Sequence, residues 1–313
     1  MSKTHKKAAL STILLLLCAT FSFSQTIQRE VAVTFDDLPA TGQSSDLAHQ
    51  KYVTDNLLAK LKSENVPAIG FVNEFKIVKY GEIDERTELL KRWLDAGHEL
   101  GNHTFSHIAI DTVSVDEYLA DLIRGETITR MLLSRKNKKL TYYRHTQLRT
   151  GPTEEYKNRL ADFLRNHGYT VAPVTIDNND YIYTIIYTRA KAAGDKQLQD
   201  RIVKSYIEYM EGVFKHFEDL SREFLGREVK QTLLLHANEI NADHFDKLAQ
   251  MIKRRGYKFI TLSEALKDEA YKLPEVQSNR GLSWMHRWML AKGLKMKEEP
   301  LQPDWVNELF RQG

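Results

Sequence analysis

Short apolar, β-rich runs alternate with longer amphipathic runs along most of this 313-residue chain. The β-rich runs predict buried strands at residues 31–35, 68–72, 169–176, 232–235 and 259–262. The amphipathic runs repeat their apolar side chains at helical spacing and predict helices at residues 51–63, 86–95, 115–135, 154–166, 197–224 and 243–254. Strands that alternate with helices favour a mostly parallel sheet, open or closed into a barrel. In such folds the chemistry lies at the carboxyl ends of the strands.

The first 24 residues have the order of a secretory signal peptide. Three lysines precede an apolar run over residues 8–21, and a small-x-small exit follows at residues 22–24. The apolar run is shorter than the roughly 20 residues that a spanning helix needs. A retained N-terminal anchor is an alternative, and a lipoprotein at Cys18 is a weaker one because the bulky Leu17 precedes it. We expect a periplasmic or secreted protein.

The composition after residue 24 excludes several classes of function and of metal ligand. Removing the three leader lysines from the 45 basic residues leaves 42, which balance the 42 acidic ones. This balance gives no indication of nucleic-acid binding or of a membrane-binding patch, and no stable membrane insertion is expected once the leader is removed. The single cysteine, Cys18, leaves with the leader, so any metal must be held by His, Asp or Glu.

No repeat or linker divides the rest of the chain. Residues 25–313 therefore predict a single domain, with an aromatic C-terminal tail from about residue 272 that wraps the surface. The sequence leaves the oligomeric state open.

Two short motifs bear the side chains of a metal-dependent hydrolase. Asp36 and Asp37 come where the first strand leaves the sheet; adjacent carboxylates repel and favour a compensating cation, although an ordinary acidic turn is an alternative. His103 and His107 would share one face of a helical turn, or would face solvent on a loop. Two histidines and one carboxylate form a familiar set for catalytic zinc, and the second carboxylate could take a proton from water.

Five motifs in order resemble the polysaccharide deacetylase family, also called carbohydrate esterase family four. They span about 200 residues and lie at residues 34–37, 103–107, 144, 177–181 and 233–236. The resemblance implies a distorted (β/α) barrel of mostly parallel strands and a metal-dependent hydrolase of non-peptide carbon–nitrogen bonds. In this family pattern Asp37, His103 and His107 correspond to the metal ligands, Asp36 to the general base and His236 to the general acid.

The same resemblance implies supporting roles. Asp180 corresponds to the carboxylate that orients His236, and Arg144 to the cation that tethers the base. A backbone N–H near Gln147 would stabilise the oxyanion, Leu234 would form an apolar wall for the acetyl methyl group, and Tyr181 would line the substrate groove.

The third motif departs from the family pattern. Residues 143–151 keep the arginine and a later glycine but lack both prolines and the aromatic residue. Tyr181 replaces the usual tryptophan, and residues 237–239 read Ala-Asn-Glu where the family often has Asp. The metal-ligand and base positions match, so the chain reads as a divergent branch. His145 and Arg149 are further candidates for contact with the site.

The expected reaction is removal of N-acetyl groups from an acetylated amino-sugar glycan or oligosaccharide. An O-acetyl esterase of the xylan type and a non-sugar amidase are alternatives that use the same machinery. A noncatalytic glycan-binding protein would predict loss of Asp36 or His236, and both are present. Zinc is the default metal, with cobalt, nickel or manganese as alternatives.

Overall fold

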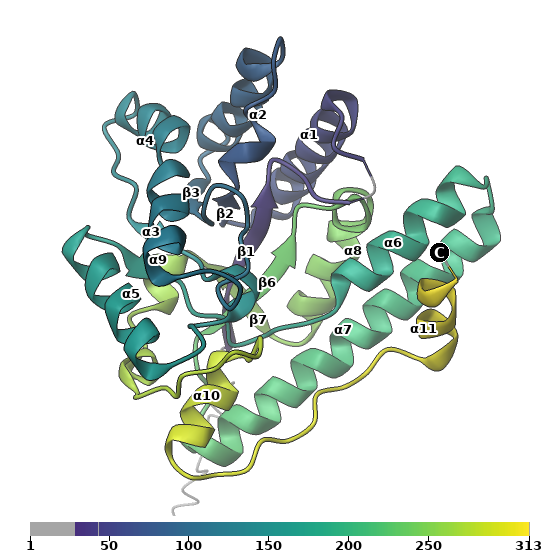
Figure 1. Ribbon diagram of the computed structural model, residues 1–313. Coiled ribbons are helices and arrows are strands. Elements are labelled where there is room, and N and C mark those ends of the chain that lie inside the picture. Colours follow the sequence, from purple (N-terminus) through teal and green to yellow (C-terminus); the bar gives the residue numbers. More distant parts are fainter. Residues whose placement is uncertain (1–28, 43, 313) are drawn as a thin grey trace, which may run out of the picture.

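Seven parallel strands form the centre of the molecule (Figure 1). The computed structural model describes residues 29–42 and 44–312, so the predicted signal peptide and Cys18 lie outside the described residues. The strands are β1 (Arg29–Leu38), β2 (Ala68–Val72), β3 (Glu99–Asn102), β4 (Tyr142–Tyr143), β5 (Thr170–Val171), β6 (Gln231–His236) and β7 (Tyr257–Ile260). Their order is β5-β4-β3-β2-β1-β6, and β7 pairs with the first half of β1.

The segment that follows β5 closes this sheet. Ile176 bridges in parallel to Leu233 of β6, while Ala172 still donates its N–H to the carbonyl of Tyr143 in β4. The strands therefore run in a ring from β1 through β5 and back to β1 by way of β6. This arrangement confirms the predicted α/β class, a distorted (β/α) barrel.

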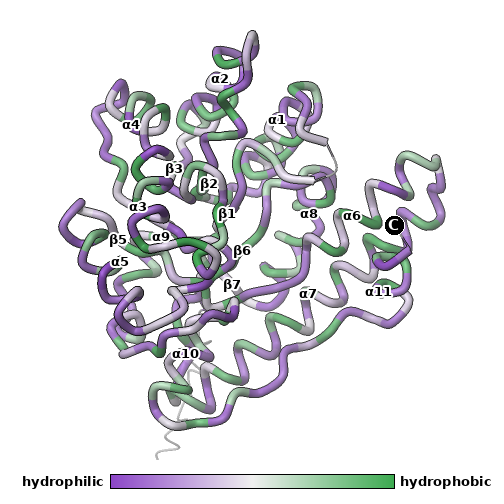
Figure 2. The backbone as a smooth tube through the Cα atoms, in the orientation of Figure 1, coloured by the Kyte–Doolittle hydropathy of each residue, from purple (hydrophilic) through white to green (hydrophobic). Residues whose placement is uncertain are grey.

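The helices pack around the outside of the ring. They are α1 (Leu47–Glu64), α2 (Ile83–Asp95), α3 (Val115–Arg124), α4 (Thr127–Ser134), α5 (Glu154–Asn166), α6 (Asp180–Ala192), α7 (Lys196–Leu225), α8 (Glu239–Arg254), α9 (Leu262–Ala265), α10 (Trp284–Ala291) and α11 (Asp304–Arg311). Figure 2 shows hydrophilic and hydrophobic stretches alternating along α7, as expected of a helix with one buried face. Among the described residues, no helix is both long and apolar enough to cross a membrane.

Strand β1 shows how the pleat divides the two faces of the ring. Phe35 packs edge-on against Trp93 of α2 and Phe245 of α8, each at a centroid distance of 5.8 Å. Its neighbours Thr34 and Asp36 must point to the opposite face, because successive side chains on a strand alternate. The outer face thus anchors the helices, and the inner face holds polar side chains.

The predicted helix over residues 115–135 is wrong in extent, because it is two helices that break at Gly125. A Cβ at this position would lie 2.6 Å from the backbone nitrogen of Phe105. The close approach requires glycine, and it brings the end of α3 against the loop that follows β3. Periodicity alone does not reveal this break, because both halves keep an apolar face.

Two predicted strands also differ in extent: one is shorter than expected, and the last lies two residues earlier. Of residues 169–176, only Thr170–Val171 form a ladder, followed by the single bridge at Ile176. The last strand ends at Ile260, because Thr261 caps helix α9. Strands β3 and β4 and helix α6 escaped prediction; β3 and β4 are too short for a periodic signal.

The C-terminal tail contains helices and is not only irregular. Trp284 and Trp288 of α10 are buried, so they pack the tail against the rest of the protein. Beyond α10 the chain runs along α7 to α11, as Figure 1 shows in yellow. Lys297 pairs there with Glu223 of α7.

Candidate active site

A bulge near the end of β1 brings two adjacent carboxylates to one place. The register between β1 and β2 shifts between Phe35 and Leu38, and Asp37 has a φ of 71°. A regular strand would send Asp36 and Asp37 to opposite faces, whereas a bulge re-aims one side chain. Both residues belong to β1 itself, not to a turn after the strand.

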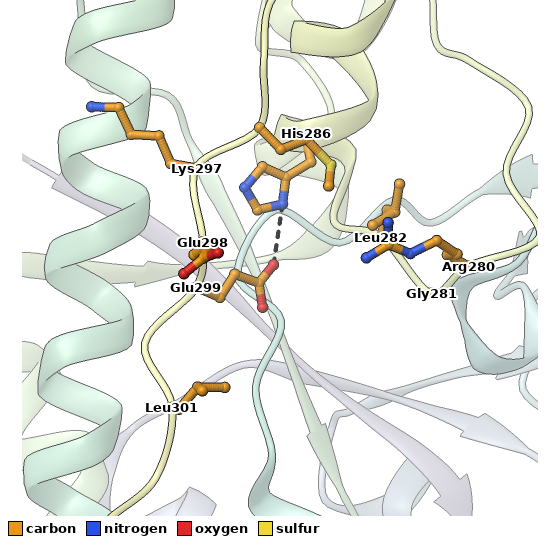
Figure 3. A pocket seen from close by; sticks show the side chains of 9 residues that line it. Arg280, Gly281, Leu282, His286, Lys297, Glu298, Glu299 and Leu301 are labelled. Carbon is orange, nitrogen blue, oxygen red and sulfur yellow. Dashed lines mark ion pairs between the residues drawn. The ribbon is translucent and has the colours of Figure 1, made fainter.

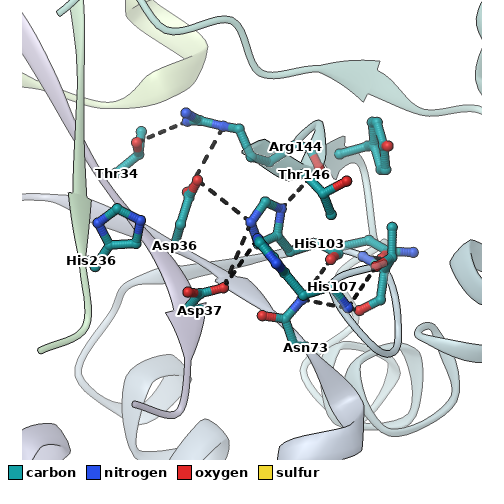
Figure 4. Close-up of polar contacts among 12 residues, drawn as sticks. Thr34, Asp36, Asp37, Asn73, His103, His107, Arg144, Thr146 and His236 are labelled. Atoms are coloured by element: carbon teal, nitrogen blue, oxygen red, sulfur yellow. Dashed lines mark hydrogen bonds and ion pairs between the residues drawn. The ribbon is translucent and has the colours of Figure 1, made fainter. Parts of the chain in front are cut away.

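Asp37, His103 and His107 converge on one point (Figure 4). Asp37 Oδ1 lies 3.8 Å from His103 Nε2 and 3.7 Å from His107 Nε2, and the three atoms are mutually within 4.8 Å. The histidines are not on a helical turn, as one reading of their spacing had it. They lie on the loop after β3, where positive φ angles at Thr104 and His107 curl the backbone around the site.

The histidines have the electronic form that a metal requires. His103 Nδ1 lies 3.0 Å from the carbonyl oxygen of Arg144 and donates its proton there, so Nε2 presents a lone pair. Burial lowers the pKa of both His103 and His107 to about 4, so both rings are neutral near pH 7. Neutral imidazoles can bind a metal without first losing a proton.

The residues present fit a divalent metal ion. Asp37 Oδ1 is buried and has no hydrogen-bond partner among the described residues. Its distances to the two imidazole nitrogens are too long for hydrogen bonds and leave room for an ion between the three atoms. Two histidines and one carboxylate match a catalytic zinc site with open positions.

Lys76 adds a positive charge that the sequence did not reveal. Its Nζ donates to the backbone carbonyl of Asp37 at 2.9 Å and lies 3.8 Å from Oδ1. Burial opposes ionisation of Asp37, but this ammonium group and the neighbouring histidines together outweigh it, and the pKa of Asp37 is lowered. The carboxylate is therefore ionised before any metal binds.

Asp36 lies beside the metal set in a different environment. Its side chain is buried, which raises its pKa, while Arg144 opposes the rise with Nε 3.9 Å from Asp36 Oδ1. Arg144 is itself held by Thr34, to which Nη2 donates at 2.8 Å, and by the ring of Phe71 at 4.6 Å. The buried guanidinium group of Arg144 therefore attracts the carboxylate of Asp36 and holds it near the site, as expected of a tether.

His236 lies beside Asp36, on the neighbouring strand β6. The two residues are register partners on β1 and β6, so both lie at the carboxyl edge of the barrel. His236 Nδ1 lies 2.7 Å from Asp180 Oδ1 at the N-terminus of α6. Burial disfavours the charged ring, but Asp180, together with Asp37 and Asp36, outweighs it, and the pKa of His236 is raised to about 10. The imidazolium is therefore the main form near pH 7.

Two asparagines that sequence reasoning missed hold Asp180 in place. Asn238 and Asn241 donate side-chain N–H groups to Asp180 Oδ2 at 3.0 and 2.7 Å, beside the backbone N–H of His236 at 2.9 Å. Asn238 occupies the region where the sequence departs from the family pattern, and it also caps α8. The segment that follows His236 therefore supports the His236–Asp180 pair.

A cavity of about 590 Å³ opens above these groups. Its lining includes most of the predicted site residues: Asp36, His103, His107, Gln147, Tyr181, Leu234 and His236. Arg149 also lines it and pairs with Asp111 at 2.6 Å. His145 does not line it, because its ring is buried and stacks on Trp284.

The cavity contains one acidic residue, Asp177, for which the sequence predicted no role. Asp177 lines the wall next to Tyr181. Burial, with a contribution from the nearby Glu299, raises the pKa of Asp177 to about 7. A half-protonated carboxyl group can both donate and accept hydrogen bonds.

Comparison with known families agrees with this geometry. The model of the family described as polysaccharide deacetylase matches residues 24–172, which include the carboxylate pair, both histidines and Arg144. The chain belongs to the polysaccharide deacetylase family. The residues around Asp180 and His236 lie beyond the matched region, so their assignment depends on the later motifs and on the geometry of this deacetylase-family barrel.

Three comparisons illustrate how far this chain resembles known proteins. It is 38% identical over 104 residues to a peptidoglycan-N-acetylglucosamine deacetylase of Bacillus cereus, covering 33% of this chain and 32% of that one. It is 30% identical to a chitin deacetylase of Pestalotiopsis sp, covering 50% and 45%. The structure of a peptidoglycan deacetylase from Bacillus subtilis aligns with a TM-score of 0.47 at 21% identity, covering 77% and 91%. The sequence matches thus span less than half of either curated relative.

Proposed function

We propose that this protein is a metal-dependent hydrolase that removes N-acetyl groups from an acetylated amino-sugar glycan. The observation that carries the proposal is the pairing of Asp36 with His236 on adjacent strands, beside the cluster of Asp37, His103 and His107. Hydrolysis of an amide needs a base for water and an acid for the amine, and these two residues line the same cavity.

The residues of the chain divide the reaction between them. A divalent ion held by Asp37, His103 and His107 would polarise the acetyl carbonyl and lower the pKa of a water molecule. Asp36 takes the proton of that water, and Arg144 keeps the carboxylate in position. A backbone N–H near Gln147 faces the developing oxyanion, a type of contact commonly worth roughly 3–4 kcal/mol. Leu234 packs against the acetyl methyl group.

The charged form of His236 favours an amide over an ester substrate. An amine is a poor leaving group unless it is protonated as the C–N bond breaks, and the pKa of His236 at about 10 keeps that proton available at neutral pH. An alkoxide leaves more readily, so an esterase depends less on such an acid. Xylan-type esterase and non-sugar amidase activities remain the alternatives.

The substrate class follows from the relatives. One is named for N-acetylglucosamine in peptidoglycan and another for chitin, and both polymers contain N-acetylglucosamine. We propose this sugar unit as the substrate, zinc as the metal, and the periplasm or the cell exterior as the location. The last point depends on the predicted signal peptide.

The test is acetate release by residues 25–313 from chitooligosaccharides, peptidoglycan fragments and acetylated xylan, with bound metal measured by elemental analysis. Release from the first two substrates, abolished by a chelator and restored by zinc, is the expected result. Release from xylan alone would favour the esterase. Bound metal without acetate from any substrate would contradict the deacetylase proposal and leave the metal site standing.

A further inference from the structure

The loop that carries Gln147 has an unusual backbone. Gln147 and Leu148 both have positive φ angles, 53° and 51°. Residues other than glycine persist in this region only where surrounding contacts hold them. Prolines fix φ covalently, but residues 143–151 contain none. Contacts from elsewhere in the chain must therefore hold this loop in shape.

Arg287 of α10 supplies these contacts. Its guanidinium group is fully buried, with Nη2 donating to the carbonyl oxygen of Leu148 and Nη1 donating to Thr150 Oγ1 at 3.0 Å. Its other hydrogen bonds reach carbonyl oxygens of the tail, those of Val276, Arg280 and Leu282. These acceptors are all neutral, so the guanidinium works through directed hydrogen bonds. It links the tail to a loop 139 positions earlier in the sequence.

The tail also contacts the loop through its backbone. Thr150 donates its N–H to the carbonyl of Ser278 at 3.0 Å, and Ser278 donates back to Thr150 Oγ1 at 3.1 Å. A Cβ at Gly281 would lie 2.7 Å from the carbonyl oxygen of Gln147.

Gly281 also places the tail in the wall of the active site. It lines the cavity above His236 and the adjoining pocket of the tail, where Figure 3 shows the ion pair between His286 and Glu299. The tail is thus part of the active-site wall at the point where Gln147 sits.

We infer that Arg287 is a positioning residue for the Gln147 loop, and that the tail does here what the prolines of the third motif do in the family pattern. The inference rests on the proposed function in one respect, the use of this loop to stabilise an oxyanion. An oxyanion forms only in the transition state, so a displaced loop lowers kcat and leaves substrate binding nearly unchanged.

The first test is Arg287→Lys in the chain without its leader. Lysine keeps the charge but has three donors and no planar fork, so it cannot serve both Leu148 and Thr150 in the same way. We expect kcat to fall about 10- to 100-fold, because a displacement of about 1 Å can cost that much, while KM stays within about twofold and bound metal is unchanged. Arg255→Lys is the matched control, because Arg255 binds Glu218 with a similar fork and makes no contact with the loop.

A second variant and a second readout keep the test independent of activity. Gly281→Ala keeps the side chain of Arg287 but presses a methyl group on the Gln147 carbonyl. Amide hydrogen exchange should become faster at residues 146–151 in both variants and stay as in the wild type at residues 101–107. Arg255→Lys should change neither segment.

The outcomes separate this inference from the proposed function. Unchanged exchange at residues 146–151 in both variants overturns the positioning role, whatever the activity. Faster exchange over the whole chain, or a loss of activity that appears in KM alone, overturns it as well. Faster exchange confined to the loop, in a protein that releases no acetate, supports the positioning role and contradicts the deacetylase proposal.

Discussion

The two sides of the cavity are held in place by different kinds of contact. On the metal side, Asp37 depends on a bulge within its own strand, and His103 and His107 depend on a short loop two strands away. The rest of the site, here called the oxyanion side, comprises His236, which depends on Asp180 56 positions earlier, and the Gln147 loop, which depends on the C-terminal tail. The metal side takes its shape mainly from the backbone of one bulge and one loop, with added bonds from Lys76 to Asp37 and from His103 to Arg144, whereas the oxyanion side is held by contacts between distant segments.

This difference explains why the third motif can diverge. The metal side has little freedom, because its three ligand atoms must meet at one point with fixed chemistry. The oxyanion side needs only a backbone N–H in the right place, and several kinds of contact can hold it there. Residues 143–151 contain no proline, and the chain buries Arg287 against this loop. Substitutions on the two sides should therefore fail in different ways.

The largest effect should come from Asp37→Ala. Removing this ligand leaves two histidines, too few to retain a catalytic metal, so both bound metal and acetate release should fall to background. Elemental analysis and the acetate assay measure the two losses together. Full metal occupancy in the variant would show that Asp37 is not a ligand, and Asp37 would then not belong to the metal side.

Asp36→Asn should separate the base from the ligands. The amide keeps the shape of the side chain but cannot accept the proton of water, so kcat should fall about 10²- to 10⁴-fold. Metal content should stay at the wild-type level, because the three ligand atoms are unchanged. A parallel loss of metal would instead make Asp36 a ligand.

Asp180→Asn should change the pH dependence. The acid works while His236 is protonated, so activity is present below its pKa and is lost as the pH rises through that value. With the pKa at about 10, the wild type should lose activity only at strongly basic pH. Without the carboxylate, burial dominates and the basic limb should move down by several units, with kcat about 10²-fold lower at pH 7. The pH profile of kcat/KM measures this shift. A basic limb that stays in place would show that Asp180 does not set the pKa of the general acid.

Leu234→Ala should have the smallest effect on the reaction itself. Removal of the proposed wall for the methyl group should lower kcat/KM for N-acetyl substrates about 10-fold and favour longer acyl groups, since a pocket of this kind distinguishes one methylene by roughly 1–3 kcal/mol. The side chain is buried, so urea unfolding of the variant should accompany the assay. An unaltered ratio of acetyl to propionyl hydrolysis would place the acyl group elsewhere in the cavity.

Much of this architecture was predictable from the sequence. The alternation of strand and helix patterns gave the α/β class, and helix α5 matches its predicted range of residues 154–166. The residue types at positions 37, 103 and 107 predicted a metal set, and the second carboxylate at position 36 predicted a base beside it. Such signals survive because they depend on side-chain chemistry and on periodicity, which can be read locally.

Other features could not be read in this way. Strand β4 has two residues and carries no periodic pattern, yet it positions Arg144. Lys76, Asn238 and Asn241 have no motif of their own, and a lone lysine or asparagine is usually a surface residue. The break at Gly125 follows from the passage of another backbone, which no local pattern records.

The sequence by itself determined the class of fold and the kinds of groups that meet in the site, because both follow from residue types and their order. Only the tertiary structure decided how the groups are charged and held: a bulge that turns Asp37 toward two histidines, a buried Asp180 that keeps His236 protonated, and a tail arginine under the Gln147 loop. The physical reason is that burial and long-range hydrogen bonds set pKa values and backbone positions, and both arise only when distant segments pack together.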